Sequence, residues 1–221
     1  MIIKQNNQQF KFSRIMFISM YFMNRLINKE FILASSSQSR YKILKNAGLR
    51  FKQIKPLFNE ERDKHLVVSK ISNPVKYTKL LSYKKAESIS KNSKGSIVVG
   101  CDTVIYYENN IINKANNFDE AFLKLKKMSG KKHIIVSGMS ILKNNKGLLS
   151  TYEKTEINMR KLSDKEIKLY LETNGKKILN SVGCYQIENL GPLIIRNIKG
   201  DFYNVMGFPL FKFLNFLLEN K

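Results

Sequence analysis

Four charged residues lie where they could carry out phosphoryl chemistry. Asp102 ends the apolar run 96–102, and Glu60 lies in a polar segment. Lys85 falls on a predicted helix, and Lys114 follows a short predicted strand pair. Carboxylates can hold a hard divalent cation such as Mg²⁺ or Mn²⁺, while cationic side chains neutralise charge on phosphate oxygens. Each residue also has a structural interpretation, because such side chains are usually solvated and an acid can cap the end of a strand.

A serine-rich turn is a second candidate for phosphate chemistry. Ser35 and Ser37 follow the apolar run 31–34 and precede a predicted helix that Gly48 would end. Hydroxyl and backbone N–H groups at a helix N-terminus attract anions. Arg40 lies in the first turns of this helix, where a guanidinium can bind a phosphate through two hydrogen bonds. The pattern predicts a phosphate cradle, with an ordinary serine N-cap as the alternative.

Strands and helices alternate along the chain, which predicts an α/β fold around a twisted mixed sheet flanked by helices. The expected strands are 31–34, 51–55, 96–102, 133–142, 151–160 and a stretch around 192–198. Helices are expected to start at Asn73–Pro74, Asn117 and Ser163, with a last amphipathic helix over 210–218. Since no segment rich in Gly, Pro or Ser divides the chain, residues 31–221 are expected to form a single domain.

Residues 1–30 are expected to be an N-terminal extension, either disordered or the result of a misplaced start. The apolar run 16–23 follows a basic segment and could pass for a signal sequence, but no small-residue cleavage site follows it. Met20 or Met23 could equally be the first residue. Targeting therefore stays the alternative interpretation.

The basic composition raises the question of nucleic-acid binding. Lys and Arg number 39 against 17 Asp and Glu, so that the formal net charge is +22. The lysines are scattered and do not alternate with aromatic residues, which favours compositional bias over a specific nucleic-acid surface. Cys101 and Cys184 lack a metal-binding spacing, which favours a reduced, cytoplasmic compartment. No apolar run reaches the length of a transmembrane helix, so no membrane partner is expected.

In combination, these motifs resemble the Maf family of nucleoside triphosphate pyrophosphatases over about residues 31–218. The matching segments are Leu33–Arg40, Asn59–Glu60, Leu81–Ala86, Gly100–Thr103, Asn113–Ala115, Ser129–Gly130 with His133, Thr155 with Arg160, Val182–Tyr185 and Gly200–Pro209. The resemblance implies a fold like that of Maf proteins and inosine triphosphatases. It also implies hydrolysis of a nucleoside triphosphate to a monophosphate and pyrophosphate, in the disposal of non-canonical or modified nucleotides.

The resemblance implies a role for each candidate residue. Asp102 would accept a proton from water or hold the divalent metal, and Glu60 would help to hold that metal. The triphosphate would be bound by the serine turn and the cationic side chains, namely Ser35, Ser37, Arg40, Lys85 and Lys114. The protein could form a homodimer.

Departures from the family pattern affect the metal site and the choice of base. Asn59 replaces the usual aspartate next to Glu60, which would weaken metal binding there. Lys114 has lost the glycine and proline that flank it in the family, which would loosen its turn. Glu188 resembles the members that act on 7-methyl-GTP, whereas Thr103 resembles those that select pyrimidines. The two signals conflict, and the preferred base is left open.

A non-catalytic protein is the alternative, since the family is associated with inhibition of septum formation. The positive charge of such a regulator would suit RNA or a membrane surface. Loss of a candidate active-site residue would have favoured this reading. The sequence instead keeps Asp102, Glu60, Lys85, Lys114 and Arg40 together, which favours an enzyme.

Overall fold

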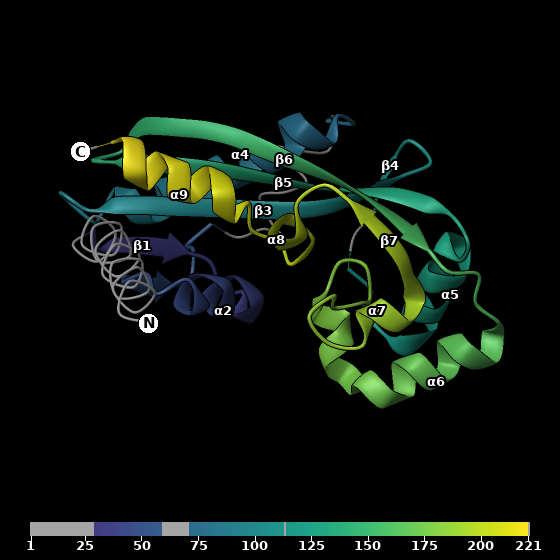
Figure 1. Cartoon of the computed structure of the whole chain (residues 1–221). Coiled ribbons are helices and arrows are strands. Elements are labelled where there is room, and N and C mark those ends of the chain that lie inside the picture. Colours follow the sequence, from purple (N-terminus) through teal and green to yellow (C-terminus); the bar gives the residue numbers. More distant parts are fainter. Residues whose placement is uncertain (1–28, 59–70, 113, 221) are drawn as a thin grey trace, which may run out of the picture.

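A mixed sheet organises the computed structural model, which describes residues 29–58, 71–112 and 114–220 (Figure 1). Its strands are β1 (Phe31–Ala34), β2 (Phe51–Ile54), β3 (Ile97–Tyr107), β4 (Asn110–Ile112), β5 (Lys132–Lys143), β6 (Lys146–Met159) and β7 (Ile195–Lys199). They are ordered β2-β1-β3-β5-β6-β7, and β4 pairs with β3. β1 runs parallel to β2 and β3, whereas the remaining pairs are antiparallel. The predicted α/β fold with a mixed sheet is confirmed, while the predictions for residues 1–28 and for Glu60 lie outside the described residues.

Helices cover both faces of this sheet. They are α2 (Gln38–Asn46), α4 (Pro74–Ser90), α5 (Phe118–Met128), α6 (Asp164–Asn174), α7 (Gly191–Ile194), α8 (Phe202–Val205) and α9 (Leu210–Glu219), with a 3₁₀ helix η1 (Gly175–Asn180). Helix α4 packs against one face of the sheet, while α2 and α9 share a hydrophobic cluster with the other. Helices α5, α6 and α7 gather at the far end of the long strands (Figure 1). None of the helices in the described part of the chain is both long and apolar enough to cross a membrane.

Local capping chemistry explains where several helices begin and end. The Asn73 side chain accepts hydrogen bonds from two backbone N–H groups of α4, and Pro74 occupies its first turn. Ser163 and Glu166 form a reciprocal capping box at α6. Gly48 follows α2 at a φ of +72°, a conformation that glycine adopts without strain. These boundaries agree with those predicted from the sequence.

Several boundaries differ from the predicted ones, among them the start of β6, which lies at Lys146 rather than Thr151. Pro192 lies in the short helix α7, and the strand starts only at Ile195, because proline suits the first turn of a helix and cannot donate to a sheet. Asp102 does not end its strand, since β3 continues to Tyr107 in register with β5. What ends near Asp102 is the neighbouring strand, because β1 stops at Ala34, opposite Gly100.

The early end of β1 leaves an open edge on β3. Beyond Gly100, β3 is next paired on this side at Ile105, which lies opposite Ile112, the last residue of β4. Within the described residues, positions 101–104 of β3 therefore face no strand on that edge. The serine turn follows β1 at the same height of the sheet as this open edge. Side chains from both faces of β3 can reach this edge.

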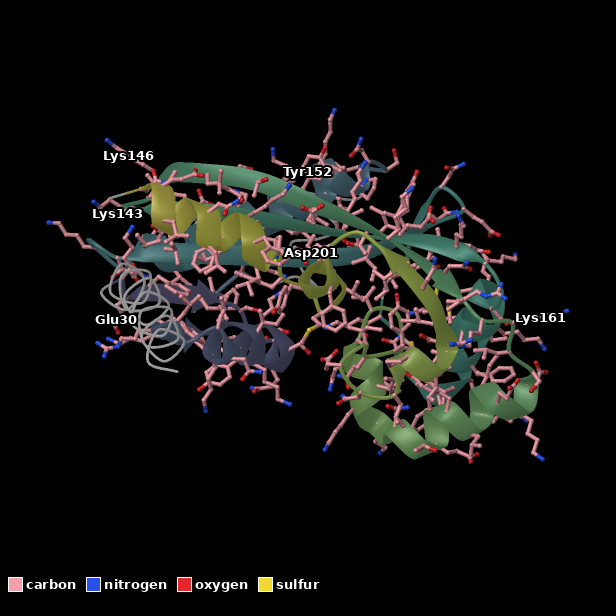
Figure 2. The ribbon with its side chains drawn as sticks, viewed as in Figure 1. Glu30, Lys143, Lys146, Tyr152, Lys161 and Asp201 are labelled. Carbon is pink, nitrogen blue, oxygen red and sulfur yellow. The ribbon has the colours of Figure 1, made fainter. Side chains whose placement is uncertain are left out.

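Basic side chains are spread over the molecule rather than gathered on one face. Figure 2 shows Lys143 and Lys146 near the tip of the β5–β6 hairpin and Lys161 at the opposite end. All three side chains are exposed. This distribution agrees with the scattered lysines of the sequence, and weak, non-specific nucleic-acid binding stays a prediction.

Close packing of α4 on the sheet depends on two glycines. A Cβ at Gly138 of β5 would lie 2.4 Å from the backbone carbon of Thr78, and one at Gly100 would lie 2.0 Å from the carbonyl oxygen of Ser82. The hydroxyls of Ser82 and Ser140 form a buried hydrogen bond of 2.9 Å across the same contact. Helix α4 therefore lies directly on the backbone of β3 and β5.

Replacing Gly138 by alanine is expected to push α4 away from the sheet. Overpacking of this kind lowers the free energy of unfolding by about 1–3 kcal/mol. Gly147→Ala is the matched control, because a Cβ at Gly147 would have no neighbour within 4 Å. Urea unfolding of both variants checks the prediction. Equal stability of the two variants would show that the α4 contact tolerates a methyl group.

Candidate active site

A buried ion pair joins α4 to the middle of β3. Lys85 Nζ lies 2.7 Å from Asp102 Oδ1, and each residue is only 6% exposed. Successive side chains of a strand point to opposite faces, so Asp102 faces α4 whereas Thr103 faces α2. Burying an ion pair costs desolvation energy that the attraction repays only in part. Such a pair beside an open sheet edge is therefore a candidate for function rather than stability alone.

Arg40 forms a second cluster on the opposite face of the sheet. It donates from Nη1 to Ser35 Oγ at 3.1 Å, from Nη2 to Thr103 Oγ1 at 3.0 Å and from Nε to the Gly207 carbonyl at 2.8 Å. Thr103 Oγ1 lies 2.8 Å from Ser137 Oγ in the paired position of β5. A guanidinium carries five N–H groups. Arg40 is thus held in place while keeping two N–H groups for an anion.

The serine turn both caps α2 and holds Arg40. Ser37 Oγ accepts from the backbone N–H of Arg40 at 3.4 Å, and Ser37 N donates to Ser35 Oγ at 3.2 Å. The Ser37 carbonyl accepts from the Gln53 side chain at 3.1 Å, which fastens the turn to β2. The N-cap suggested as the alternative reading is present. Capping and phosphate binding are compatible, because a capped helix N-terminus still has backbone N–H groups without an intrahelical partner.

The predicted site residues thus fall into three places. The first place is the middle of β3, which two clusters approach from opposite faces. One is the Lys85–Asp102 pair, and the other is Arg40 with the serine turn and Thr103. The two clusters occupy adjacent positions along the strand. Lys114 is exposed just after β4, the strand beyond the open edge. The third place is the segment between η1 and α7, which carries the exposed Glu188.

The Glu188 side chain contacts α2, the helix that follows the serine turn. Its Oε1 accepts a hydrogen bond from Ser39 Oγ at 3.2 Å, across 149 positions of sequence. Ser39 directly precedes Arg40, so this contact ties the segment of Glu188 to the same turn of α2. The link was not predicted from the sequence.

Three contributors to the site were missed by sequence reasoning. They are Ser39, Ser137 and the carbonyl of Gly207. The carbonyl accepts from Arg40, while φ of Gly207 is +99°, a value that favours glycine. Ser137 is found only through the β3–β5 register. For Gly207, the available signal in the sequence was its place in the segment Gly200–Pro209, which matches the family pattern.

The segment that carries Glu188 is anchored in the core by a histidine and a tyrosine. His133 Nε2 and the Tyr185 hydroxyl lie 2.6 Å apart. The Ser181 hydroxyl donates to the Tyr185 carbonyl at 2.5 Å. Burial lowers the pKa of His133 to about 4 and raises the pKa of Tyr185. Both side chains are therefore neutral near pH 7.

The donor set can be compared with the needs of a divalent cation. Within the described residues, no three His, Cys, Asp or Glu side chains converge as a metal cage. Lys85 binds Oδ1 of Asp102, so a cation would approach Oδ2. Mg²⁺ commonly binds through one or two carboxylates together with substrate phosphates and water. The site therefore fits a cation that arrives with a triphosphate, and the predicted ligand Glu60 lies outside the described residues.

Comparison with known proteins places these residues in a wider context. A family model described as Maf-like protein matches residues 30–220, a range that includes every candidate site residue. A dTTP/UTP pyrophosphatase of Thermosipho melanesiensis is 34% identical over 192 residues, covering 87% of this chain and 98% of the relative. A nucleoside triphosphate pyrophosphatase of Ruegeria pomeroyi is 33% identical over 186 residues, covering 84% and 94%. A solved HAM1 protein from Coxiella burnetii aligns with 86% of this chain and 99% of its own at 13% identity and a TM-score of 0.47.

The low pKa of His133 predicts that stability falls in mild acid. Unfolding restores an ordinary histidine pKa near 6.5, so below that pH the unfolded chain binds a proton that the folded chain excludes until about pH 4. Stability should fall by about 1.4 kcal/mol per pH unit across this window, in addition to any contribution from carboxylates. Urea unfolding at pH 7.5 and pH 5 measures the loss. His133→Gln cannot titrate and should lose less stability between the two pH values; an equal loss in both proteins would contradict the prediction.

Proposed function

Because the chain belongs to the Maf family, we propose that it hydrolyses nucleoside triphosphates to a nucleoside monophosphate and pyrophosphate. The observation that carries the proposal is the buried Lys85–Asp102 pair, next along β3 to the Arg40 cluster at an open sheet edge. Phosphoanhydride hydrolysis requires a carboxylate that activates water and cationic groups that bind phosphate oxygens. Modified or non-canonical nucleotides are the proposed physiological substrates.

In the proposed reaction, a water oxygen forms a bond to the α-phosphorus. The bond from that phosphorus to the oxygen bridging to the β-phosphorus breaks, and pyrophosphate leaves. Asp102 Oδ2 would accept the proton of the attacking water or bind the metal. Lys85 would offset the negative charge of Asp102, which would otherwise repel an anionic substrate bound next to it.

Cationic groups around the edge would bind the triphosphate. Arg40 would use the N–H groups that its contacts to Ser35, Thr103 and Gly207 leave over. Because those contacts hold its guanidinium in advance, little side-chain entropy is lost when phosphate binds. Lys114 and the serine turn, with the N-terminus of α2, would add further positive potential.

A divalent cation would join the substrate at Asp102, with Glu60 as a further proposed ligand. Bound Mg²⁺ or Mn²⁺ polarises phosphoryl oxygens and makes bound water more acidic. The described donors are hard oxygens, which favour these cations over Zn²⁺.

A nucleotide panel tests the proposed activity. Purified protein is incubated with ATP, GTP, UTP, dTTP and 7-methyl-GTP in Mg²⁺ or Mn²⁺, and products are separated by chromatography. We expect monophosphate and pyrophosphate from at least one substrate, and none after chelation of the metal. Release of a diphosphate with orthophosphate would contradict the proposed bond cleavage. Undiminished activity in chelator would contradict the metal requirement.

Asp102→Asn should cost the enzyme most of its turnover. Loss of a general base typically reduces the rate by ~10²–10⁴-fold. The amide oxygen of asparagine can still accept from Lys85, and circular dichroism checks that the fold is kept. Asp119→Asn, on the exposed first turn of α5, is the control and should keep full activity. Turnover of Asp102→Asn near that of the parent would remove Asp102 from the mechanism.

Glu188 is proposed to read the base. An ionised carboxylate only accepts hydrogen bonds, and guanine offers N1–H and a 2-amino group side by side, whereas uracil offers N3–H between two acceptors. The side chain should therefore favour guanine-type nucleotides, by roughly 1–3 kcal/mol for a bidentate contact. Glu188→Gln should shift the ratio of kcat/KM values toward UTP or dTTP and away from 7-methyl-GTP. A ratio that stays the same across the panel would show that Glu188 does not contact the base.

A further inference from the structure

The turn around Gly207, whose carbonyl accepts from Arg40, is held in place by Asn204. We infer that Asn204 is a positioning residue for Arg40, an inference that rests on the phosphate-binding role proposed for that guanidinium. Arg40 Nε donates to the Gly207 carbonyl at 2.8 Å, and Gly207 N donates to the Asn204 carbonyl at 3.0 Å. Asn204 is fully buried and belongs to the short helix α8, just before Gly207.

The Asn204 amide joins α8 to two strands of the sheet. Its Nδ2 donates to Thr155 Oγ1 at 2.9 Å and to the Ile135 carbonyl at 3.3 Å, and these two acceptors belong to residues paired across β5 and β6. The Thr155 hydroxyl donates onward, at 3.1 Å, to the carbonyl of Asp201, the N-cap of α8 labelled in Figure 2. The start and the end of this helical turn are therefore fastened to the same point of the sheet.

These contacts lie on the same face of the sheet as the Arg40 cluster. Thr103, which accepts from Arg40, pairs with Ser137 of β5. Ile135 precedes Ser137 by two positions and pairs with Thr155 of β6. Paired residues, and residues two apart along a strand, point to the same side, so Thr103 and Thr155 share a face. The sheet thus fixes Arg40 twice, directly through Thr103 and indirectly through the α8 turn.

Asparagine is a costly residue at this buried position. Asn204 Oδ1 has no hydrogen-bond partner among the described residues, and burying an unpaired acceptor is unfavourable for folding. What the amide achieves is the placement of the turn that carries Gly207, whose φ of +99° favours glycine. A guanidinium held at Nε by that turn presents its remaining N–H groups in one direction, which suits binding of phosphate oxygens through two hydrogen bonds.

Loss of the Asn204 donors should loosen Arg40 and weaken phosphate binding. Calorimetry with inorganic tripolyphosphate, in chelator so that no turnover occurs, is applied to the parent, Asn204→Ala, Arg40→Ala and the double variant. Asn204→Ala should raise the Kd about tenfold, as expected when a hydrogen bond to a charged group is largely lost. In the Arg40→Ala background the same substitution should have no effect, because Asn204 acts through Arg40.

A second measurement follows Arg40 without any ligand. The Arg40 Nε–H resonance, assigned by its absence from Arg40→Lys, should exchange with solvent faster in Asn204→Ala than in the parent. This comparison reports directly on the hydrogen bond to the Gly207 carbonyl, and it does not depend on hydrolysis.

Thr155 variants and a distant variant separate positioning from general structural damage. Thr155→Ser keeps the hydroxyl that links Asn204 to Asp201 and should bind tripolyphosphate like the parent, whereas Thr155→Val keeps the shape alone and should bind about as weakly as Asn204→Ala. Ser163→Ala removes the capping box of α6. It should lower the free energy of unfolding in urea and leave the Kd unchanged.

Several outcomes would overturn the inference. Asn204→Ala could weaken binding equally with and without Arg40, or leave the exchange of the Arg40 Nε–H unchanged. Tripolyphosphate binding that Arg40→Ala leaves intact would remove the phosphate-binding role of Arg40 and the inference with it. Faster exchange and weaker binding in Asn204→Ala, together with a parent that releases no pyrophosphate, would instead support the inference and refute the proposed function.

Discussion

The approach of α4 to the sheet is the constraint on which the candidate site depends. Gly100 and Gly138 leave the backbone of β3 and β5 bare, so the helix lies against it without side chains between. A helix held farther out by even one methyl group would carry Lys85 away from Asp102, to which it now lies at 2.7 Å. Closely packed protein interiors transmit small shifts, so the geometry of the ion pair depends on the packing of the core.

The second constraint is the difference in length between neighbouring strands. β1 has 4 residues and β3 has 11, so β3 runs on beyond its parallel neighbour. At that point the alternation of a strand places Asp102 and Thr103 on opposite faces of the sheet. Because no neighbouring strand covers the edge there in the described residues, both faces are within reach of one ligand. A fully paired strand would have kept the two clusters apart.

The Arg40 cluster illustrates how structural and proposed functional roles combine in one residue. Its guanidinium joins the serine turn, β3 and the turn at Gly207, three segments that are distant in the sequence. Those contacts use only part of its donors. The same side chain can therefore organise the local fold and present a preoriented cation to phosphate. The Ser39–Glu188 contact extends this arrangement to the segment proposed to read the base.

Local residue patterns predict much of the secondary structure. The caps at Asn73 and Ser163 and the stop at Gly48 were predictable because capping depends on residues within one turn of the chain. The family motifs also indicated which residues belong to the candidate site. The prediction of a strand at Pro192 is wrong, because proline suits the first turn of a helix, and Pro192 lies in α7.

How the site residues meet depends on the tertiary structure. The Lys85–Asp102 pair, the acceptors of Arg40 and the Ser39–Glu188 hydrogen bond each join segments from different elements. Such contacts depend on strand register, on the point where β1 ends and on how closely α4 approaches the sheet. These quantities arise from packing of the whole chain, and local residue patterns carry no information about them.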